Sequence, residues 1–385
     1  MEIAPVELLI FQATPFCNLN CGYCYLPNRK DRRIIDLETV RVTVERLSRE
    51  GLLSPSFSIV WHSGEPMVVS RDAYSKYFQI IRETLGPSYA VRHHFQTNGT
   101  LINDTWCDFI REHNLSIGVS IDGPEYIHDL ERRTWGSRGS FRQVMRGIER
   151  LRANGVVFHT ISVVGNASLD FPSEIYEFLV SLEPDFIGFN VEEQEGAHLT
   201  TSVADHSERV ERFFRTIYKL AKANGFAPPI REFESAYLAI QEGKGSCRNA
   251  QIAPFRILSV AVDGGFTTFS PELLGMSSPA YGSLNLGNIL TDSPSAIARS
   301  DKLLTLLKAV QAGVNRCKET CDYFELCGGG TPSNKLFEKG SFDVAATRFC
   351  ESSIKAPLRI VLDDLESVLM GNGKTNAEEE IDFVH

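Results

Sequence analysis

The segment Thr14–Tyr25, TPFCNLNCGYCY, is the stretch around which the rest of the chain can be interpreted. Its three cysteines, Cys17, Cys21 and Cys24, follow the spacing CxxxCxxC, with small or polar residues between them that let the backbone wrap around a compact group. Zinc sites normally close with four ligands, whereas a 4Fe–4S cluster held by three thiolates keeps one iron open. The spacing therefore predicts an iron–sulfur cluster with an open iron, and a disulfide is the alternative.

The composition narrows the class of protein. The chain has 385 residues, a formal net charge of -10 and no basic stripe, which argues against general nucleic-acid binding. Its apolar runs are far shorter than the ~20 residues that span a bilayer, and we find no signal-peptide pattern. We therefore expect a cytoplasmic protein without a membrane partner, whose reduced thiols are available for metal.

A regular alternation of apolar segments and helical patterns predicts an α/β fold. The expected strands are 6–11, 57–61, 91–95, 115–121, 156–164 and 186–191. The expected helices are 36–50, 71–85, 104–113, 141–154, 171–182 and 206–224. Consecutive β-then-α units with short loops and right-handed crossovers require a parallel sheet, here curled into a partial (β/α)6 TIM barrel. Glycines at 51, 86, 155 and 225 follow four of these helices, where a left-handed cap is favoured.

The alternation stops near residue 230, which predicts a second unit. We expect the barrel in residues 1–230, a domain with further cysteines in residues 231–370 and a flexible acidic tail in residues 371–385. Within the second unit we expect a helix at 232–241, a hairpin of 257–262 with 266–269, and a helix at 295–311. Its cysteines are Cys317, Cys321, Cys327 and Cys350. Four thiolates close the ligand set of one 4Fe–4S cluster, and a zinc site is the alternative.

Polar and glycine-containing segments follow the expected strands. They are Ser63–Pro66, Thr97–Thr100, Ser120–Pro124, Gly165–Asn166 and Asn190–Glu193. Because the chemistry of parallel α/β barrels gathers at the C-terminal ends of the strands, we expect these segments to share one rim with the cysteines of the first segment. Ordinary strand-to-helix turns are the alternative for each of them.

The phrase CNLNCGYCY and the SGEP segment resemble the radical S-adenosylmethionine (SAM) enzymes. The resemblance implies that the first cluster binds SAM through its open iron and that Ser63, Gly64 and Glu65 lie where the family contacts the amino group of SAM. The residues that we expect to bind this cofactor are Tyr23, Ser63, Gly64, Glu65, Thr97, Asn98, Ser120, Asp122 and Arg132. A structural role remains the alternative for Asp122, and a solvated charge run explains Arg132 almost as well.

The C-terminal cysteines resemble the SPASM extension of peptide-modifying radical SAM enzymes, often called SPASM/twitch-like. The resemblance implies one auxiliary 4Fe–4S cluster on Cys317, Cys321, Cys327 and Cys350. The chain departs from the family pattern because Ser270 and Thr331 stand where two cysteines of a nearer auxiliary cluster would fall. We therefore expect that nearer cluster to be lost and Cys247 to be left over from it.

The phrases FQATPFCNLNCGYCYLP, DGPEYIHD and FSPELLG are similar to the cyclophane-forming GrrM-type peptide maturases. This resemblance implies hydrogen abstraction from a side-chain Cβ of a ribosomal precursor peptide and a C–C cross-link to an aromatic ring. Anaerobic sulfatase maturation or thioether formation is the alternative, and a non-catalytic Fe–S scaffold or redox sensor is a remote one. The implied partners are the precursor peptide and an electron donor such as flavodoxin or ferredoxin, and no catalytic acid or base is assigned.

Three carboxylates follow the sixth expected strand, at Glu192, Glu193 and Glu195. On the rim of the barrel they would raise the local negative potential and steer a basic precursor peptide inward. A solvated acidic loop is the alternative.

Overall fold

The computed structural model describes residues 4–243 and 249–379. Within them, a nine-stranded sheet has the order β11-β8-β7-β1-β2-β3-β4-β5-β6. Its first six strands in the chain are β1 Val6–Phe11, β2 Leu53–Trp61, β3 Ala90–Thr97, β4 Ser116–Ser120, β5 His159–Val164 and β6 Ile187–Val191. Each of these strands pairs in parallel with the next, so the predicted partial barrel is confirmed.

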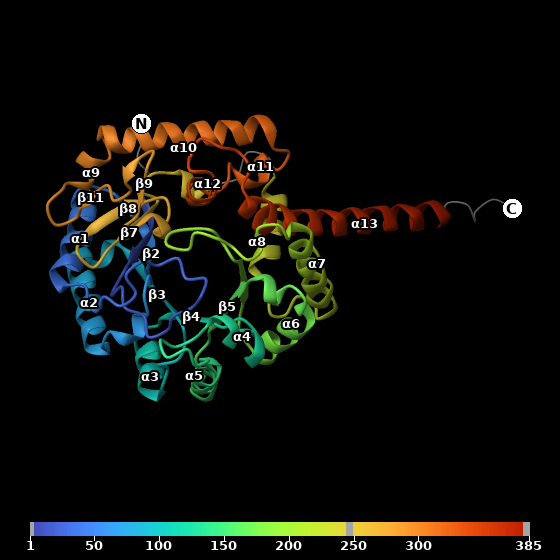
Figure 1. Cartoon of the computed structure of the whole chain (residues 1–385), viewed down its shortest axis with the longest axis horizontal. Coiled ribbons are helices and arrows are strands. Elements are labelled where there is room, and N and C mark those ends of the chain that lie inside the picture. The colour runs from blue at the N-terminus through green and yellow to red at the C-terminus, as the bar shows by residue number, and fades with distance from the viewer. Residues whose placement is uncertain (1–3, 244–248, 380–385) are drawn as a thin grey trace.

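The predicted helices are confirmed within a few residues, and they surround the sheet (Figure 1). They are α1 Leu37–Arg49, α2 Arg71–Leu85, α3 Asp104–Glu112, α5 Phe141–Ala153, α6 Pro172–Ser181 and α7 Ser207–Ala223. A short helix that we did not expect, α4 Glu125–Glu131, follows β4. Gly51 and Gly225, with φ of 67° and 65°, end α1 and α7 in the left-handed region, as the sequence predicts.

Amphipathic helices fix the barrel by burying one face each against the sheet. Helix α1 buries Val40, Val44 and Leu47, and the exposed face carries its charged residues. The fully buried Trp61 of β2, which packs against α2, stacks on Phe11 of β1 with ring centroids 5.1 Å apart. This packing holds β1 and β2 in register. The cysteine segment begins after β1, and the SGEP segment begins after β2.

The second part of the chain continues the same sheet. Strand β7 (Ile257–Val260) pairs in parallel with β1 and forms the predicted antiparallel hairpin with β8 (Gly265–Thr268). Strand β11 (Gly287–Asn288) lies beyond β8, while β9 (Ser277–Ser278) and β10 (Gly282–Ser283) form a separate small ribbon. The helices of this part are α8 Arg231–Glu242, α9 Pro294–Ile297, α10 Asp301–Thr320, α11 Phe324–Cys327, α12 Pro332–Lys339 and α13 Ala356–Glu379.

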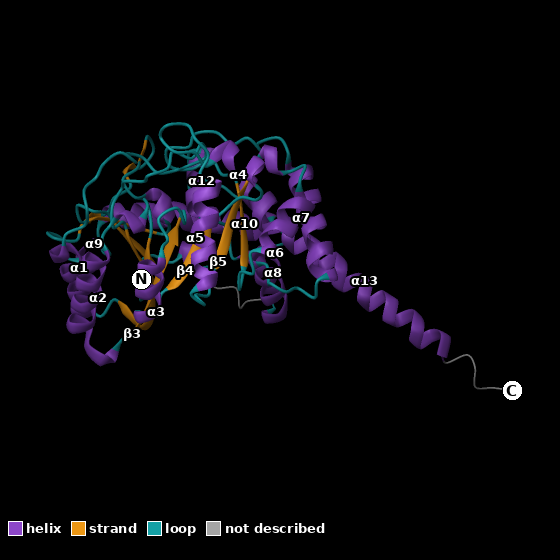
Figure 2. Cartoon of the chain, turned by 90° about the horizontal axis from the view of Figure 1, so that it is seen from below, coloured by secondary structure: helices purple, strands orange, loops and turns teal. Residues whose placement is uncertain are grey.

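Two sequence predictions for this part were wrong in extent. The helix expected at 295–311 is broken before Ser300, whose hydroxyl caps α10 by accepting a hydrogen bond from Leu303 N at 3.3 Å, and α10 then runs on to Thr320. The tail expected from residue 371 continues α13 as far as Glu379, and this helix projects from the body of the protein (Figures 1 and 2). Residues 380–385 and Cys247 lie outside the described residues.

None of the helices in the described ranges combines the length and the apolar character needed to cross a membrane.

Candidate active site

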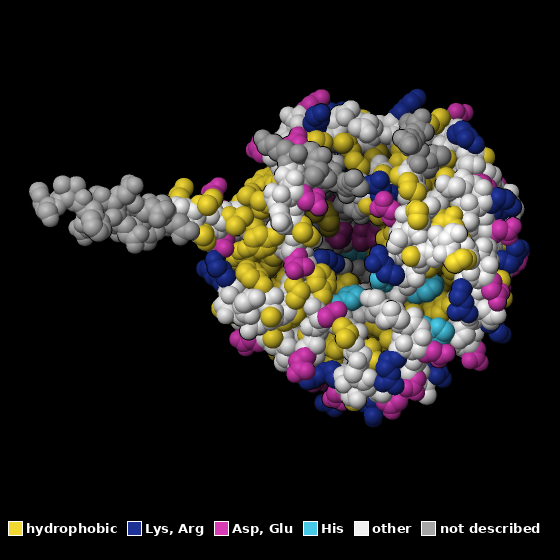
Figure 3. All heavy atoms as spheres, turned by 180° about the vertical axis from the view of Figure 1, so that it is seen from behind, with side chains coloured by type: hydrophobic (Ala, Val, Ile, Leu, Met, Phe, Trp, Pro, Cys, Tyr) yellow, Lys and Arg dark blue, Asp and Glu magenta, His cyan; other side chains and the backbone are white. Residues whose placement is uncertain are grey.

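The loops that follow the strands gather on one side of the sheet (Figure 2) and line a cavity of about 360 Å³. This volume lies within the range of small-molecule sites. The barrel contributes, among others, Cys17, Cys21, Tyr23, Cys24, Tyr25, His62, Gly64, Glu65, Gln96, Thr97, Asn98, Ser120, Arg132, Glu192, Glu193 and Glu195. The C-terminal part contributes Gln251, Glu272, Thr331, Ser333, Asn334 and Phe349. Viewed from behind, the molecule is hollowed at its centre, with acidic side chains in the depth (Figure 3).

The cysteine segment after β1 is held by two neighbouring loops. Cys17 N donates to Arg29 O at 3.1 Å, and Asn20 N donates to Arg133 O at 2.6 Å. The Arg29 guanidinium donates in turn to Cys21 O at 3.1 Å. These backbone contacts fix the segment, so that its three half-buried cysteines line the same cavity.

The surroundings of these thiols fit a metal cluster better than free thiols. The pKa of Cys17 is raised to about 12 and that of Cys21 to about 11. Burial is the main cause, and the charge of nearby thiolates contributes to both increases. Grouped thiolates in a buried place need a compensating positive charge, which a bound cluster supplies. Asn98 Nδ2 also donates to Cys17 Sγ at 3.7 Å. Among residues 4–243 and 249–379, no group of three or more His, Cys, Asp or Glu could hold a single metal ion.

Glu65 joins the turns after β2 and β3. Its buried carboxylate accepts hydrogen bonds from Thr97 Oγ1 at 2.6 Å, Asn98 N at 2.8 Å and Met67 N at 2.9 Å. Glu65 N donates to Phe16 O at 2.9 Å, and Gly64, with φ of 136°, lies so close to Thr14 O that a Cβ would approach it to 2.0 Å. The carboxylate thus ties the turns after β2 and β3 together, the Glu65 N–H ties them to the cysteine segment, and the contact of Glu65 with a cofactor amine stays a prediction.

Three further cofactor candidates also make contacts within the protein. Besides its contact with Cys17, the Asn98 amide donates to Asn18 Oδ1 at 2.8 Å. Ser120 Oγ accepts a hydrogen bond from Gln96 Nε2 at 3.0 Å, and both side chains line the cavity. Ser63 is 1% exposed, and its hydroxyl lies 3.5 Å from Tyr25 Oη. These residues shape the wall beside the cysteines, and their contacts with a cofactor stay a prediction.

Asp122, Arg132 and Tyr23 form a buried unit. Asp122 Oδ2 pairs with Arg132 Nε at 2.9 Å and accepts a hydrogen bond from Tyr23 Oη at 2.6 Å, while Oδ1 accepts one from Val163 N at 2.9 Å. The solvated charge run proposed for Arg132 was therefore wrong, because this side chain is 6% exposed and lines the cavity. Asp122 has the loop-fixing role that the sequence left open, and Arg132 lowers the pKa of Cys21 against the effect of burial.

The acidic rim after β6 differs from our expectation. Glu192 accepts hydrogen bonds from Ser202 and faces His198 Nε2 at 2.9 Å, and Glu193 accepts one from Asn334 Nδ2 at 2.5 Å. Burial raises the pKa of Glu193 to about 8 and that of Glu195 well above its ordinary value. All three side chains line the cavity, so they do not form the solvated acidic loop that was the alternative. The raised pKa values of Glu193 and Glu195 weaken the negative potential expected of them, and the steering of a basic precursor peptide stays a prediction.

Two cavity residues, Glu272 and His62, were missed by the sequence reasoning. Burial raises the pKa of Glu272 to about 7, and its charge acts on Glu193 and Glu195, so the three form a carboxyl cluster. His62 Nε2 lies 3.1 Å from Tyr25 Oη, and burial lowers the pKa of this histidine to about 4. His62 directly precedes the SGEP segment, so its place at a strand end was a usable signal, and Glu272 belongs to the phrase FSPELLG, whose resemblance was noted without a role for this residue.

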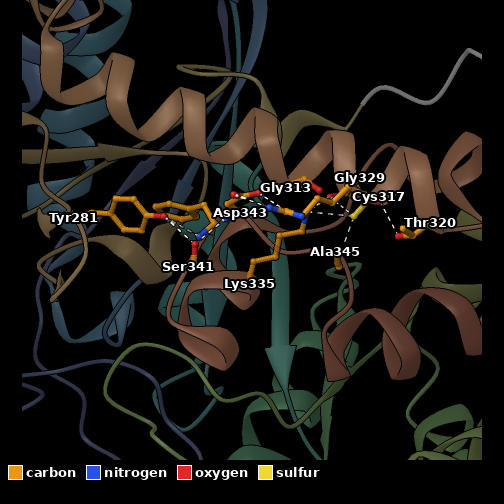
Figure 4. A network of polar contacts seen from close by, with 11 residues as sticks. Tyr281, Gly313, Cys317, Thr320, Gly329, Lys335, Ser341, Asp343 and Ala345 are labelled. Carbon is orange, nitrogen blue, oxygen red and sulfur yellow. Dashed lines mark hydrogen bonds and ion pairs between the residues drawn. The ribbon is translucent and has the colours of Figure 1, made fainter.

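The C-terminal cysteines gather around the end of α10 and around α11. Burial raises the pKa of Cys327, and the charges of Cys317 and Cys321 also raise it. Burial raises the pKa of Cys350 to about 12. Figure 4 shows Lys335 of α12 beside Cys317. Its ammonium, on a side chain 2% exposed, donates to Gly313 O at 3.0 Å, Gly329 O at 2.8 Å and Cys317 Sγ at 3.3 Å. Buried thiols beside a cation fit a ligand set for a cluster.

Of the two positions where the family pattern has further cysteines, Thr331 lines the cavity, and Ser270 is buried but is not among the lining residues. Thr331 Oγ1 donates to Gln251 Oε1 at 3.1 Å and lines the cavity, and Ser270 is buried one residue after Phe269, whose φ is 76°. Hydroxyl and amide groups thus occupy the wall where the family pattern would place thiols.

Comparisons with known proteins agree with this geometry. Residues 11–192 match the radical SAM superfamily model. The uncharacterized protein sll1766 of Synechocystis sp. is 36% identical over 96% of this chain and 94% of its own length. The serine-type anaerobic sulfatase-maturating enzyme of Bacteroides thetaiotaomicron is 25% identical over 90% of this chain and 87% of its own. A solved structure, native anSMEcpe with bound AdoMet and Cp18Cys peptide, is 24% identical with a TM-score of 0.78, covering 94% of this chain and 98% of that one.

The matched residues run from the end of β1 through β6 and include the cysteine segment, the SGEP turn and the Asp122–Arg132 pair. The chain therefore belongs to the radical SAM superfamily, whose members bind SAM and a 4Fe–4S cluster.

Proposed function

We propose that the protein is a radical SAM enzyme that oxidises a side chain of a peptide or protein substrate held in the cavity. The observation that carries this proposal is the single cavity in which the cysteine segment of the barrel faces the Glu193–Glu195–Glu272 carboxyl cluster. The cavity is lined by both parts of the chain, so a substrate bound there would contact both. The similarity to sulfatase-maturating enzymes supports a substrate of this class.

The residues in place fit the cofactors. Cys17, Cys21 and Cys24 would hold the SAM-binding cluster, and Cys317, Cys321, Cys327 and Cys350 would hold an auxiliary one. When bound there, SAM and the cluster would supply the radical chemistry that removes hydrogen from an unactivated carbon.

The side chains of the cavity would carry the remaining proton. Oxidation of a C–H carbon that bears a hydroxyl to a carbonyl removes one hydrogen atom, one proton and one electron. Burial raises the pKa of Glu272 to about 7, so a substantial fraction of this carboxyl is deprotonated at neutral pH and can take up a proton released by the substrate, whereas Glu193, with its pKa raised to about 8, is mostly protonated. A cluster held by Cys317, Cys321, Cys327 and Cys350 would take up the electron. Asn98 and Arg132 meanwhile hold the cysteine segment and its charge in place.

Two products are compatible with this site. Formation of formylglycine, the alternative given by the sequence, is now the first candidate, because the relatives with curated activities are sulfatase-maturating enzymes. The cyclophane cross-link is the second candidate. It is supported by Ser270 and Thr331, which replace the thiols of the nearer auxiliary cluster in the family pattern.

The experiment combines SAM cleavage with product chemistry. Anaerobically reconstituted enzyme would be incubated with SAM, a reductant and two peptides, one with a sulfatase-type Ser or Cys and one with an aromatic cross-linking motif. Serine oxidation and cross-linking both remove two hydrogen atoms, so mass alone cannot separate them. A hydrazine reagent labels only the aldehyde. Labelled product establishes the first candidate, and unlabelled product with a cross-linked fragment pattern establishes the second. Absence of 5′-deoxyadenosine from the iron-replete enzyme would contradict both.

A further inference from the structure

The outer side of the cysteine segment carries positive charge, although the whole chain is acidic with a net charge of -10. We call this surface the basic platform. It consists of Trp135 and five cations: Arg29 and Lys30, which lie against its ring, Arg32, which lies against Phe16, and Arg133 and Arg138, which belong to the same 133–139 loop as Trp135. Four of the cations are exposed, Arg29 is half-buried, and within residues 4–243 and 249–379 none of the five forms an ion pair. The platform is thus a local reversal of the charge of the molecule.

The platform is bonded directly to the cysteine segment. Trp135 Nε1 donates to Cys17 O at 2.9 Å, and the Arg29 guanidinium donates to Cys21 O at 3.1 Å. Two of the three candidate cluster ligands therefore have their backbone carbonyls in contact with platform side chains. No other protein layer intervenes between these two cysteines and the platform.

The centre of the platform is an exposed aromatic ring. Trp135 is 38% exposed, with Lys30 Nζ 4.7 Å and the Arg29 guanidinium carbon 5.7 Å from its ring centroid. Arg32 lies 4.2 Å from the ring centroid of Phe16, the residue before Cys17. These cation–π contacts keep the cations close to the ring while their charge stays available to solvent. Nearby Arg33 is left out of the platform because Asp31 neutralises it.

We propose that the basic platform docks an acidic one-electron carrier protein of the flavodoxin or ferredoxin type, which reduces the cluster on Cys17, Cys21 and Cys24. The net negative charge of the chain repels such a carrier elsewhere, so the platform selects one face by charge complementarity. The step moves one electron from the carrier to the cluster, without bond or proton transfer. It rests on the cluster assigned above and is independent of which peptide product is formed.

The test reverses two positive charges of the platform, those of Lys30 and Arg133. Reduced flavodoxin and a reduced ferredoxin would each be mixed with the oxidised holoenzyme, and the rate constant of cluster reduction would be followed by absorbance. In the variant Lys30→Glu/Arg133→Glu, reduction by the carrier that uses this face should slow by about tenfold or more at low ionic strength, with a weaker dependence on salt. The matched control, Lys219→Glu/Lys308→Glu, makes the same charge change on exposed residues of α7 and α10 and should leave the rate unchanged.

A small reductant separates docking from damage to the cluster. Methyl viologen radical cation needs no docking surface, so it should reduce the platform variant at least as fast as the parent. Loss of reduction with methyl viologen as well would place the fault in the cluster assignment and overturn the inference with it. Unchanged rates with both carriers would overturn the inference alone, as would equal slowing in the control variant. A platform variant that loses affinity for the peptide while both carriers react normally would assign the surface to the substrate instead.

Discussion

The two cysteine groups of this protein differ in how they face the rest of the molecule. Cys17, Cys21 and Cys24 are half-buried and line the cavity, next to positions that could receive a cofactor. In the C-terminal group, Cys317 and Cys350 are buried, and none of its four members lines that cavity. A three-ligand site that is open to a cavity is suited to reaction, whereas a closed four-ligand site is suited to holding or passing an electron.

The positive charges beside the two groups differ as well. Arg132, beside the first group, is matched by the carboxylate of Asp122 at 2.9 Å. Lys335, beside the second, forms no ion pair within the described part of the chain and directs its ammonium to two carbonyls and Cys317 Sγ. At the first site the charge of Arg132 is neutralised by Asp122, which suits the binding of a charged cofactor. At the second site the ammonium of Lys335 has no carboxylate partner among the described residues and contacts Cys317 Sγ.

The largest effect should follow removal of the first group. Replacing Cys17, Cys21 and Cys24 with Ala should abolish formation of 5′-deoxyadenosine, because no ligands remain for the SAM-binding cluster. Iron bound after anaerobic reconstitution should fall by about half, since the C-terminal ligands are independent. The control is Cys107→Ala, which removes a buried cysteine of α3 that is far from both groups in the sequence. This variant should retain both 5′-deoxyadenosine formation and the parental iron content. Normal SAM cleavage by the triple variant would contradict the assignment of the SAM-binding cluster to these three cysteines.

Disruption of the second group should separate two activities. In Cys327→Ala, SAM cleavage should survive in part, because the first group is intact, but peptide modification should be lost. The measurement is the ratio of modified peptide to 5′-deoxyadenosine, determined by chromatography. An iron-depleted Cys327→Ala protein that modifies peptide at the parental ratio would show that the C-terminal group has no part in the reaction.

A smaller effect is expected from the cation of the second group. Lys335→Met should shift the midpoint potential of the auxiliary cluster to more negative values, because a positive charge and a hydrogen bond to Cys317 Sγ favour the reduced state. The potential would be followed by EPR during a redox titration. Lys339→Met removes an exposed cation one turn further along α12 and should leave the potential unchanged. Equal potentials for parent and Lys335→Met would remove the proposed electrostatic difference between the sites.

The smallest effect concerns the carboxyl cluster. Because burial raises the pKa of Glu193 to about 8, the folded state binds this proton more tightly than the unfolded state, and its contribution to stability is lost as pH rises from about 4.5 through about 8. Glu193→Gln should therefore match the parental Tm near pH 5 and exceed it increasingly towards pH 9. Scanning calorimetry of the holoenzyme would show this divergence, and parallel Tm curves would contradict the assigned burial.

Much of the fold could be predicted because its signals are local. The alternation of apolar strands with amphipathic helices gave six parallel strands, and the strand-end rule placed Glu65, Asn98 and Ser120 beside the cysteines. The state of Glu193 was not predictable from its neighbours in sequence. It depends on Asn334 and Glu272, which approach it from distant parts of the chain. The burial of Arg132 was not predictable for the same reason, since it depends on the fold around Tyr23, and the alternative of a solvated charge run could not be dismissed from the sequence.

The most direct test of the account is the iron content of the anaerobically reconstituted parent protein, measured with Mössbauer spectroscopy to identify the cluster type. One cluster in each cysteine group predicts about eight irons per chain, all in 4Fe–4S clusters. About four irons would contradict the assignment of the C-terminal cysteines. About twelve would show that the nearer auxiliary site persists despite Ser270 and Thr331, and would remove the basis for the closed, single auxiliary cluster.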